Sequence, residues 1–105
     1  VKIGTNCRIQ SHSFICSGVT IERGCFIAHG VFFTNDKFSG GKPSGSQSDW
    51  KETWVGENVS IGSGSTILPV KICSGCVIGA GAVVTKDILV KGVYAGNPAR
   101  LLRKL

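Results

Sequence analysis

The apolar residues of this chain recur at intervals of six. In the first third, one series keeps this interval without a break: Ile3, Ile9, Ile15, Ile21, Ile27 and Phe33. A second series stands two residues before each member of the first: Val1, Cys7, Ser13, Val19, Cys25 and Val31. A period of six fits neither a helix, with about 3.6 residues per turn, nor one long alternating strand. It fits short strands with two inward side chains each, joined by turns.

The pattern resumes in the second half. The main series continues with Val55, Ile61 and Ile67 and then, one residue early, with Ile72, Ile78, Val84 and Val90. Its companions are Thr53, Val59, Ser65, Val70, Cys76, Ala82 and Ile88. The slip of one residue falls at Leu68-Pro69, and a proline is tolerated at a corner or at an edge strand.

Three such units would close one triangular coil, which predicts stacking of residues 18 apart in neighbouring coils, about 4.8 Å from each other. Ile3 would lie on Ile21, Ile9 on Ile27, and Ile15 on Phe33. We therefore expect a single all-β domain over residues 1–105, a parallel β-helix of hexapeptide repeats with its first coils over 1–34 and its last coils over 53–91. An ordinary β-sandwich would not keep this phase from residue 3 to residue 33.

Residues 35–52 interrupt the repeat with a polar segment rich in glycine and serine. Long surface insertions cost little extra entropy, so this inserted segment can be a tolerated loop. However, loops longer than about 12–15 residues are often lids or binding loops. Its aromatic residues, Phe38 and Trp50, favour a protruding functional loop.

Composition and charge narrow the range of partners. The net charge is +6, but the 12 basic residues are scattered and do not alternate with aromatic residues, as on a nucleic-acid surface. A phosphate-bearing small molecule is the better match, and no apolar run approaches the roughly 18–20 residues of a membrane span. Five cysteines, an odd number, are typical of a reduced, cytoplasmic protein. Because the chain has no Met and the repeat is already running at Val1, we expect further coils to precede it in the natural protein.

The closing segment carries the most specific motifs. Asn97 can cap a helix and Pro98 can begin it, which predicts a short C-terminal helix over residues 97–105. Gly79-Ala-Gly-Ala-Val-Val-Thr-Lys-Asp87, followed by Ala95-Gly-Asn-Pro-Ala-Arg100, resembles the closing signature of the hexapeptide-repeat acyltransferases. Leu89-Val-Lys91 departs from that family, in which many members carry a proline pair at this point. The resemblance extends over nearly the whole chain outside the inserted segment.

This resemblance implies a left-handed β-helix that assembles as a homotrimer, with acetyl-CoA as co-substrate and active sites between subunits. In the family, backbone groups of the last coils bind the pantetheine arm, which implicates Gly79, Ala80 and Ala82. Lys86, Arg100 and Arg103 are the candidates for the CoA phosphates.

Transfer of an acyl group to an amine or hydroxyl needs a route for the proton of the nucleophile, and histidine is a natural base. The chain has two histidines, His12 and His29. The stretch from Phe26 to Asp36 is similar to that of N-acetyltransferases that acylate amino sugars on nucleotide carriers, enzymes of surface-polysaccharide synthesis. This similarity implies that His29 is the catalytic base or a hydrogen-bonding residue, and that Asn35 and Asp36 contact the sugar. His12 aligns with Gly30 of the next coil, so we expect the two imidazoles to be close neighbours and take His12 as a further substrate-binding candidate.

Three functional hypotheses stay open. The first is N-acetylation of a nucleotide-linked amino sugar, the second is O-acetylation of a sugar, serine or antibiotic, and the third is a non-catalytic trimeric scaffold. A zinc carbonic anhydrase on this fold would need three histidine ligands, and the chain has two. Cys73-Ser-Gly-Cys76 has the spacing of a metal or redox motif but no second pair, and the repeat explains Cys76 as a small inward residue, so we expect neither a metal site nor a redox role.

Overall fold

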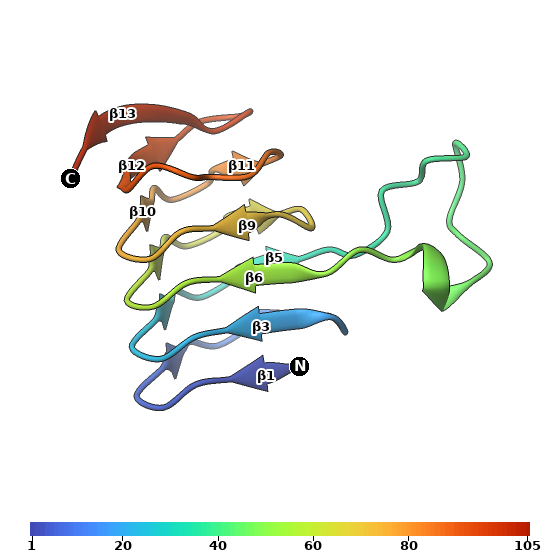
Figure 1. The fold of residues 1–105 in the computed structure, drawn as a ribbon, viewed down its shortest axis with the longest axis horizontal. Coiled ribbons are helices and arrows are strands. Elements are labelled where there is room, and N and C mark those ends of the chain that lie inside the picture. The colour runs from blue at the N-terminus through green and yellow to red at the C-terminus, as the bar shows by residue number, and fades with distance from the viewer.

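The computed structural model describes residues 1–105 as a stack of short strands in three sheets (Figure 1). The four-stranded sheet contains, in spatial order, β1 (Lys2–Ile3), β3 (Val19–Ile21), β6 (Thr53–Val55) and β9 (Lys71–Ile72). The three-stranded sheet contains β5 (Phe32–Phe33), β8 (Thr66–Ile67) and β11 (Val83–Val84). The six-stranded sheet contains β2 (Arg8–Ile9), β4 (Phe26–Ile27), β7 (Ser60–Ile61), β10 (Val77–Ile78), β12 (Gly92–Ala95) and β13 (Arg100–Lys104). Through most of the stack, successive strands of the chain belong to different sheets and pair in parallel with the coil below, so the chain forms a parallel β-helix.

The stacking predicted from the period of six is confirmed. Ile3 pairs with Ile21, and Ile9 pairs with Ile27. The slip at Leu68-Pro69 is confirmed as well, because Ile61 pairs with Ile78, which lies 17 residues further along the chain.

The inward side chains form one continuous core. Ile27 and Ile61 are fully buried, and Ile78 is 1% exposed. Burying an isoleucine side chain stabilises the folded state by about 1.5–3 kcal/mol, so each inner column is a large source of stability. Ile3 and Ile9, in the first of the described coils, are 48% and 36% exposed.

Beyond Val84 the predicted series is wrong. Ile88, not Val90, stacks on Ile72, and Val90 is 47% exposed. The side chain of Asp87 provides the reason, because its Oδ1 accepts a hydrogen bond from the backbone N–H of Lys71 at 2.9 Å. The carboxylate takes the place of a backbone carbonyl there, and the chain re-enters the coil two residues early.

The predicted C-terminal helix over residues 97–105 is also wrong. Residues 100–104 form β13, which pairs antiparallel with β12. A helix of nine residues is marginal by itself, whereas β12 would otherwise be an open sheet edge with unpaired N–H and C=O groups. Gly92 lets the strands approach, since a Cβ atom there would lie 2.7 Å from the backbone oxygen of Arg103.

The inserted segment, residues 35–52, joins β5 to β6 and lies to one side of the stack (Figure 1). It contains a 3₁₀ helix, η1 (Gln47–Asp49), whose N-cap Ser46 accepts a hydrogen bond from the N–H of Ser48 at 3.3 Å. None of the helical structure in the chain has the length and apolar character that crossing a membrane requires.

Candidate functional site

His29 lies on the edge of the coil where the six-stranded sheet meets the three-stranded sheet. We call this the histidine edge; it contains residues 11–12, 29–30, 63–64 and 80–81 of successive coils. Backbone bonds hold the coils in register here, from the N–H of Gly30 to Ser11 O (3.1 Å) and from the N–H of Gly64 to His29 O (3.1 Å). The edge is therefore a rigid column from which His29 projects.

The His29 side chain is exposed and has one polar neighbour in the chain, because its Nδ1 lies 3.5 Å from Ser63 Oγ. Nε2 has no hydrogen-bond partner. His12, one coil below, is also exposed and adopts a left-handed backbone conformation with φ of 63°. The two histidines occupy adjacent positions on the same edge, and no hydrogen bond joins them.

Small residues leave room beside His29 along this edge. Gly64 and Gly81 have φ of 72° and 70°, and a Cβ atom on either would meet nothing within 4 Å. The carbonyl of Ser63 accepts a hydrogen bond from the N–H of Gly81 in the next coil. The carbonyl of Ala80 has no such donor in a further coil and is left without a partner. The upper end of the edge thus offers open space and a free acceptor to an extended ligand.

Of the three residues predicted to bind the pantetheine arm, Gly79 and Ala82 face away from this open space. Ala82 is fully buried in the core, with its N–H bonded to Gly79 O and its carbonyl bonded to Thr66 N. The N–H of Gly79 donates to Tyr94 O at 2.7 Å. Ala80 is the most accessible of the three.

Asn35 lies on a different edge, where the inserted segment leaves the stack. We call this the loop edge; it contains residues 17–18, 34–35, 68–69 and 85–86. The side-chain amide of Asn35 donates to the backbone O and the Oγ of Ser17, at 3.2 and 3.3 Å. Its Oδ1 has no partner in the chain and is free to accept a hydrogen bond.

Asp36 anchors the inserted segment. Its Oδ1 accepts from the N–H of Phe38 at 3.0 Å, and its Oδ2 accepts from the N–H of Ser44 at 2.6 Å. It also lines a pocket of ≈ 450 Å³ at the loop edge, with Thr34, Lys37, Phe38, Leu68 and Thr85. The repeat could not predict that Leu68 and Thr85 line this pocket. Both residues directly follow an inward position and precede a turn, and the repeat specifies only the inward positions.

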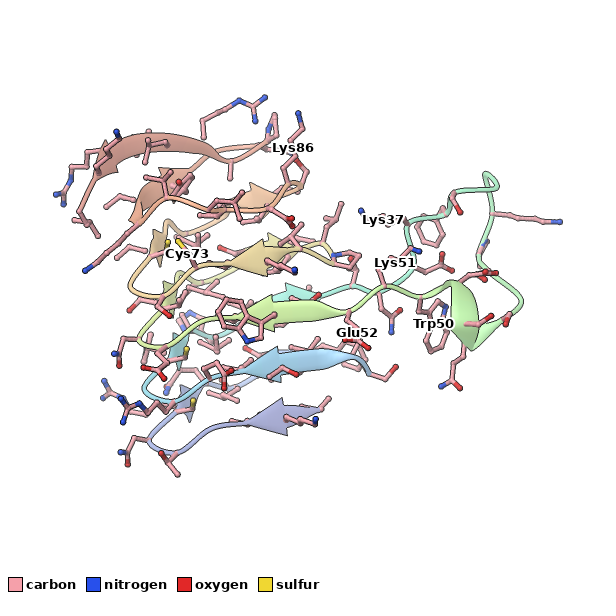
Figure 2. The ribbon with its side chains drawn as sticks, in the orientation of Figure 1. Lys37, Trp50, Lys51, Glu52, Cys73 and Lys86 are labelled. Carbon is pink, nitrogen blue, oxygen red and sulfur yellow. The ribbon has the colours of Figure 1, made fainter.

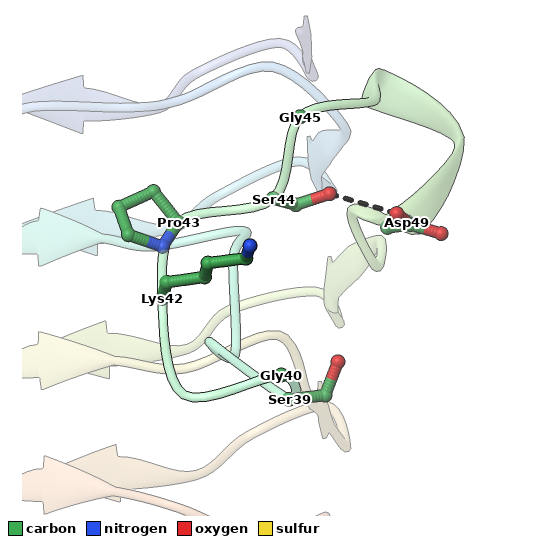
Figure 3. A pocket seen from close by; sticks show the side chains of 7 residues that line it. All are labelled: Ser39, Gly40, Lys42, Pro43, Ser44, Gly45 and Asp49. Carbon is green, nitrogen blue, oxygen red and sulfur yellow. Dashed lines mark hydrogen bonds between the residues drawn. The ribbon is translucent and has the colours of Figure 1, made fainter.

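A second pocket of ≈ 300 Å³ lies within the inserted segment (Figure 3). Seven residues line it, none of them hydrophobic, and Ser44 Oγ donates to Asp49 Oδ2 across it at 2.8 Å. Figure 2 shows Trp50 beside η1, and its indole Nε1 is buried without a hydrogen-bond partner.

The predicted phosphate-binding residues are separated. Lys86 is exposed at the loop edge, at the same side of the stack as the inserted segment (Figure 2). Arg100 begins β13 opposite Ala95, and its Nη1 donates to the carbonyl of Ala99 at 3.1 Å. Arg103 pairs with Val93 further along the strand, so Arg100 is the nearer of the two to the histidine edge.

One chain does not bring the predicted site residues together. His29 and Asn35 are separated by one full side of the coil, six residues that span at most about 20 Å. Lys86 is separated from Ala80 in the same way. No group of three or more His, Cys, Asp or Glu side chains in the chain has the arrangement of a metal site.

Comparison with known proteins adds the family to this geometry. The model described as "Bacterial transferase hexapeptide (six repeats)" matches residues 1–35, and the one described as "Hexapeptide repeat of succinyl-transferase" matches residues 53–86. The chain is 34% identical over 111 residues to a chloramphenicol acetyltransferase of Agrobacterium fabrum, covering 97% of this chain and 50% of that protein.

Two solved structures show the same fold. The apoenzyme of soybean serine acetyltransferase matches with a TM-score of 0.76 and 32% identity over 96% of this chain and 40% of its own. The polySia-specific acetyltransferase NeuO matches with a TM-score of 0.83 and 29% identity over 97% of this chain and 50% of its own. The chain spans half or less of the length of each of these three proteins. With both halves matched by hexapeptide models and the repeat visible in every coil, the chain belongs to the hexapeptide-repeat transferase family.

Proposed function

We propose that this chain is the catalytic β-helix of an acetyltransferase that moves the acetyl group of acetyl-CoA to the amine of a nucleotide-linked amino sugar. The observation that carries this proposal is the exposed His29 beside an open column of small residues, Gly64, Ala80 and Gly81. An imidazole next to space for a narrow, extended ligand is what a thioester substrate and an incoming nucleophile require.

The amine nitrogen of the acceptor attacks the thioester carbonyl, and His29 accepts the proton that the amine loses. The carbon–sulfur bond then breaks, and the CoA thiolate leaves and is protonated. An amine that arrives neutral needs little base catalysis, and in that case His29 chiefly orients it through a hydrogen bond. Asn35 Oδ1, which is free in this chain, accepts a hydrogen bond from the sugar.

The free carbonyl of Ala80 fits an amide N–H of the pantetheine arm. Lys86 and Arg100 supply the charge that the CoA phosphates need, with Arg103 further along β13.

The active site is shared between chains of a homotrimer of left-handed β-helices. The histidine edge of one copy meets the loop edge of its neighbour, because within one chain these edges lie a full side of the coil apart. In this arrangement the inserted segment of the neighbour covers the acceptor. The five cysteines are all free, in keeping with a reducing cytoplasmic location.

The second candidate is O-acetylation. It is favoured by the 34% identity to a chloramphenicol acetyltransferase and the 32% identity to a serine acetyltransferase. A hydroxyl acceptor depends more on a base than a neutral amine does, so the loss of His29 should affect it more strongly.

A thiol-release assay separates the candidates. The protein is incubated with acetyl-CoA and a panel of amino sugars, nucleotide-linked amino sugars, serine and chloramphenicol. Turnover with nucleotide-linked amino sugars alone supports the proposal, and turnover only with hydroxyl acceptors overturns it in favour of O-acetylation. If calorimetry detects no binding of acetyl-CoA, the chain is a scaffold and not an enzyme.

A further inference from the structure

Cys73 and Cys76 lie at the third edge of the coil, between β9 and β10. We call this the thiol edge; it contains residues 5–6, 23–24, 57–58 and 74–75 of successive coils. Their Sγ atoms are 3.4 Å apart, joined by the turn Ser74-Gly75. Cys76 is fully buried, whereas Cys73 is partly exposed, so solvent reaches one member of the pair. Spacing alone did not support a redox role for these cysteines, but the distance between the sulfur atoms does.

The two thiols differ in their place in the fold, because Cys76 is an inward residue of the core and Cys73 packs against the core from its edge. Cys76 occupies an inward position that Val59 fills in the coil below, so a small apolar side chain suffices there. Cys73 directly precedes the turn, and its Sγ has the Sγ of Cys76 as its one hydrogen-bond partner. In contrast, the thiol of Cys7 donates to Glu22 O at 3.1 Å, and that of Cys25 donates to Gly56 O at 3.0 Å.

The turn is shaped for closure of a disulfide. A disulfide bond is about 2.05 Å long, so the sulfur atoms need to approach each other by little more than 1 Å. Gly75 adopts φ of 78°, a conformation that glycine enters without strain, and its N–H donates to Glu57 O at 2.8 Å, so the turn holds the two cysteines at this short separation.

A cation covers the same turn. A Cβ atom on Gly75 would lie 2.6 Å from Cε and 3.2 Å from Nζ of Lys91. No carboxylate pairs with Lys91, since the one ion pair of the chain joins Arg23 to Glu57. The ammonium is therefore available to stabilise negative charge on sulfur. Burial raises the pKa of Cys76 to about 11, so the partly exposed Cys73 is the thiol that reacts first.

We propose that Cys73 and Cys76 form an oxidation site for hydroperoxides, at which the two thiols become a reversible intramolecular disulfide. The Cys73 thiolate attacks the terminal oxygen of the hydroperoxide, and the O–O bond breaks. The sulfur becomes a sulfenic acid, and the leaving oxygen takes up a proton as an alcohol or as water. The Cys76 sulfur then attacks the Cys73 sulfur, a sulfur–sulfur bond forms, and the hydroxyl leaves as water with the Cys76 proton. In total, two thiols and one hydroperoxide give one disulfide, one alcohol or water, and one further water.

This site lies away from the acetyltransferase site proposed above. Figure 2 shows Cys73 on the side of the stack opposite the inserted segment. The thiol edge is a different corner of the coil from the histidine edge and the loop edge. It therefore stays open to solvent when those two edges meet between copies. The inference therefore stands or fails independently of the proposed acyl transfer.

The test is titration of the reduced full chain with hydrogen peroxide. We expect one equivalent to remove two of the five free thiols, with loss of two hydrogens from the intact mass. Trypsin cleaves after Lys71 and Lys86, so both cysteines fall in one peptide, residues 72–86, where an internal disulfide is identified by mass spectrometry. Dithiothreitol should restore all five thiols.

Two cysteine variants and one lysine variant test the proposed roles of the individual residues. In Cys76→Val, which copies Val59, Cys73 should stop at a sulfenic acid that dimedone traps, and in Cys73→Ser the rapid loss of thiols should disappear. Lys91→Gln should slow the oxidation by about two- to fivefold.

Oxidation of Cys16 or Cys25 before Cys73, a disulfide between chains, or over-oxidation of Cys73 without a disulfide would each overturn the proposal. Equal melting temperatures of the reduced proteins show that the variants are folded.

Discussion

The Nδ1 atom of His29 lies 3.5 Å from the hydroxyl oxygen of Ser63, one coil further along the histidine edge. The two residues are 34 positions apart in the chain, because the inserted segment separates their coils. Hydrogen bonds of this kind are usually about 2.7–3.2 Å long, so the contact steers the imidazole without fixing it. The ring keeps the freedom to turn toward an acceptor.

Replacing His29 with Asn should lower kcat/KM of acetyl transfer by about 10²–10⁴ where His29 acts as the general base, and by less where it only orients a neutral amine. Stability should change by less than about 0.5 kcal/mol because the side chain is exposed. The rate is measured by thiol release with an acceptor identified in the panel, and stability by urea unfolding.

Arg23→Gln is the matched control for that experiment. Arg23 is exposed at the thiol edge, away from His29, and pairs with Glu57 at 3.3 Å. This variant should keep its activity. An unchanged kcat/KM in the His29 variant would remove the residue from the mechanism.

The inner columns of the coil could be predicted from the sequence, since two inward residues per strand repeat with the strand. The pairs Ile3–Ile21 and Ile9–Ile27 follow from the period alone. The period also places His29 and Asn35 one side of the coil apart, because they are six residues apart. The contacts of outward side chains could not be predicted in this way, since the inserted segment breaks the phase between His29 and Ser63, 34 positions further along the chain.

Ile61→Ala should lower the free energy of unfolding by about 2–5 kcal/mol, because the side chain is fully buried between Ile27 and Ile78. Ile9 occupies the same column in the first coil but is 36% exposed. Ile9→Ala should therefore cost clearly less. Urea unfolding of both variants measures the difference, and equal losses would contradict the column as the source of stability.

The tail shows where local signals fail. Asn97-Pro98 is a good start for a helix, and this predicts the wrong element because the edge of β12 competes for the same residues. The backbone N–H of Ala99 donates to Val83 O at 2.9 Å and ties the tail to the last coil before β13 begins. A propensity counted over nine residues does not include this sheet edge.

Gly92→Val should separate β13 from β12. A Cβ atom at this position would lie 2.5 Å from Leu101 Cδ1 and 2.7 Å from Arg103 O, and the backbone atom cannot yield without a shift of the strand. We expect a loss of about 1–3 kcal/mol, as for other overpacked sites. Amide hydrogen exchange should accelerate at residues 93–95. Val93→Ile, on the same strand, is the control and should leave the exchange unchanged.

The buried thiol of Cys76 should make stability depend on pH in the alkaline range. Burial raises the pKa of this thiol from 9.0 to about 11, so between these values the unfolded chain releases a proton that the folded chain retains. The contribution of Cys76 is complete below about pH 9 and is lost as the pH rises toward 11. Urea midpoints of the reduced protein should thus fall more steeply across this range than those of Cys76→Val. The other buried thiols titrate in both proteins. The pKa of Tyr94 is raised mainly by burial and in part by Cys76, so the difference between the two slopes reports the ionisation of Cys76 together with its effect on Tyr94. Parallel curves would show that the Cys76 thiol ionises as readily in the folded chain as in the unfolded one.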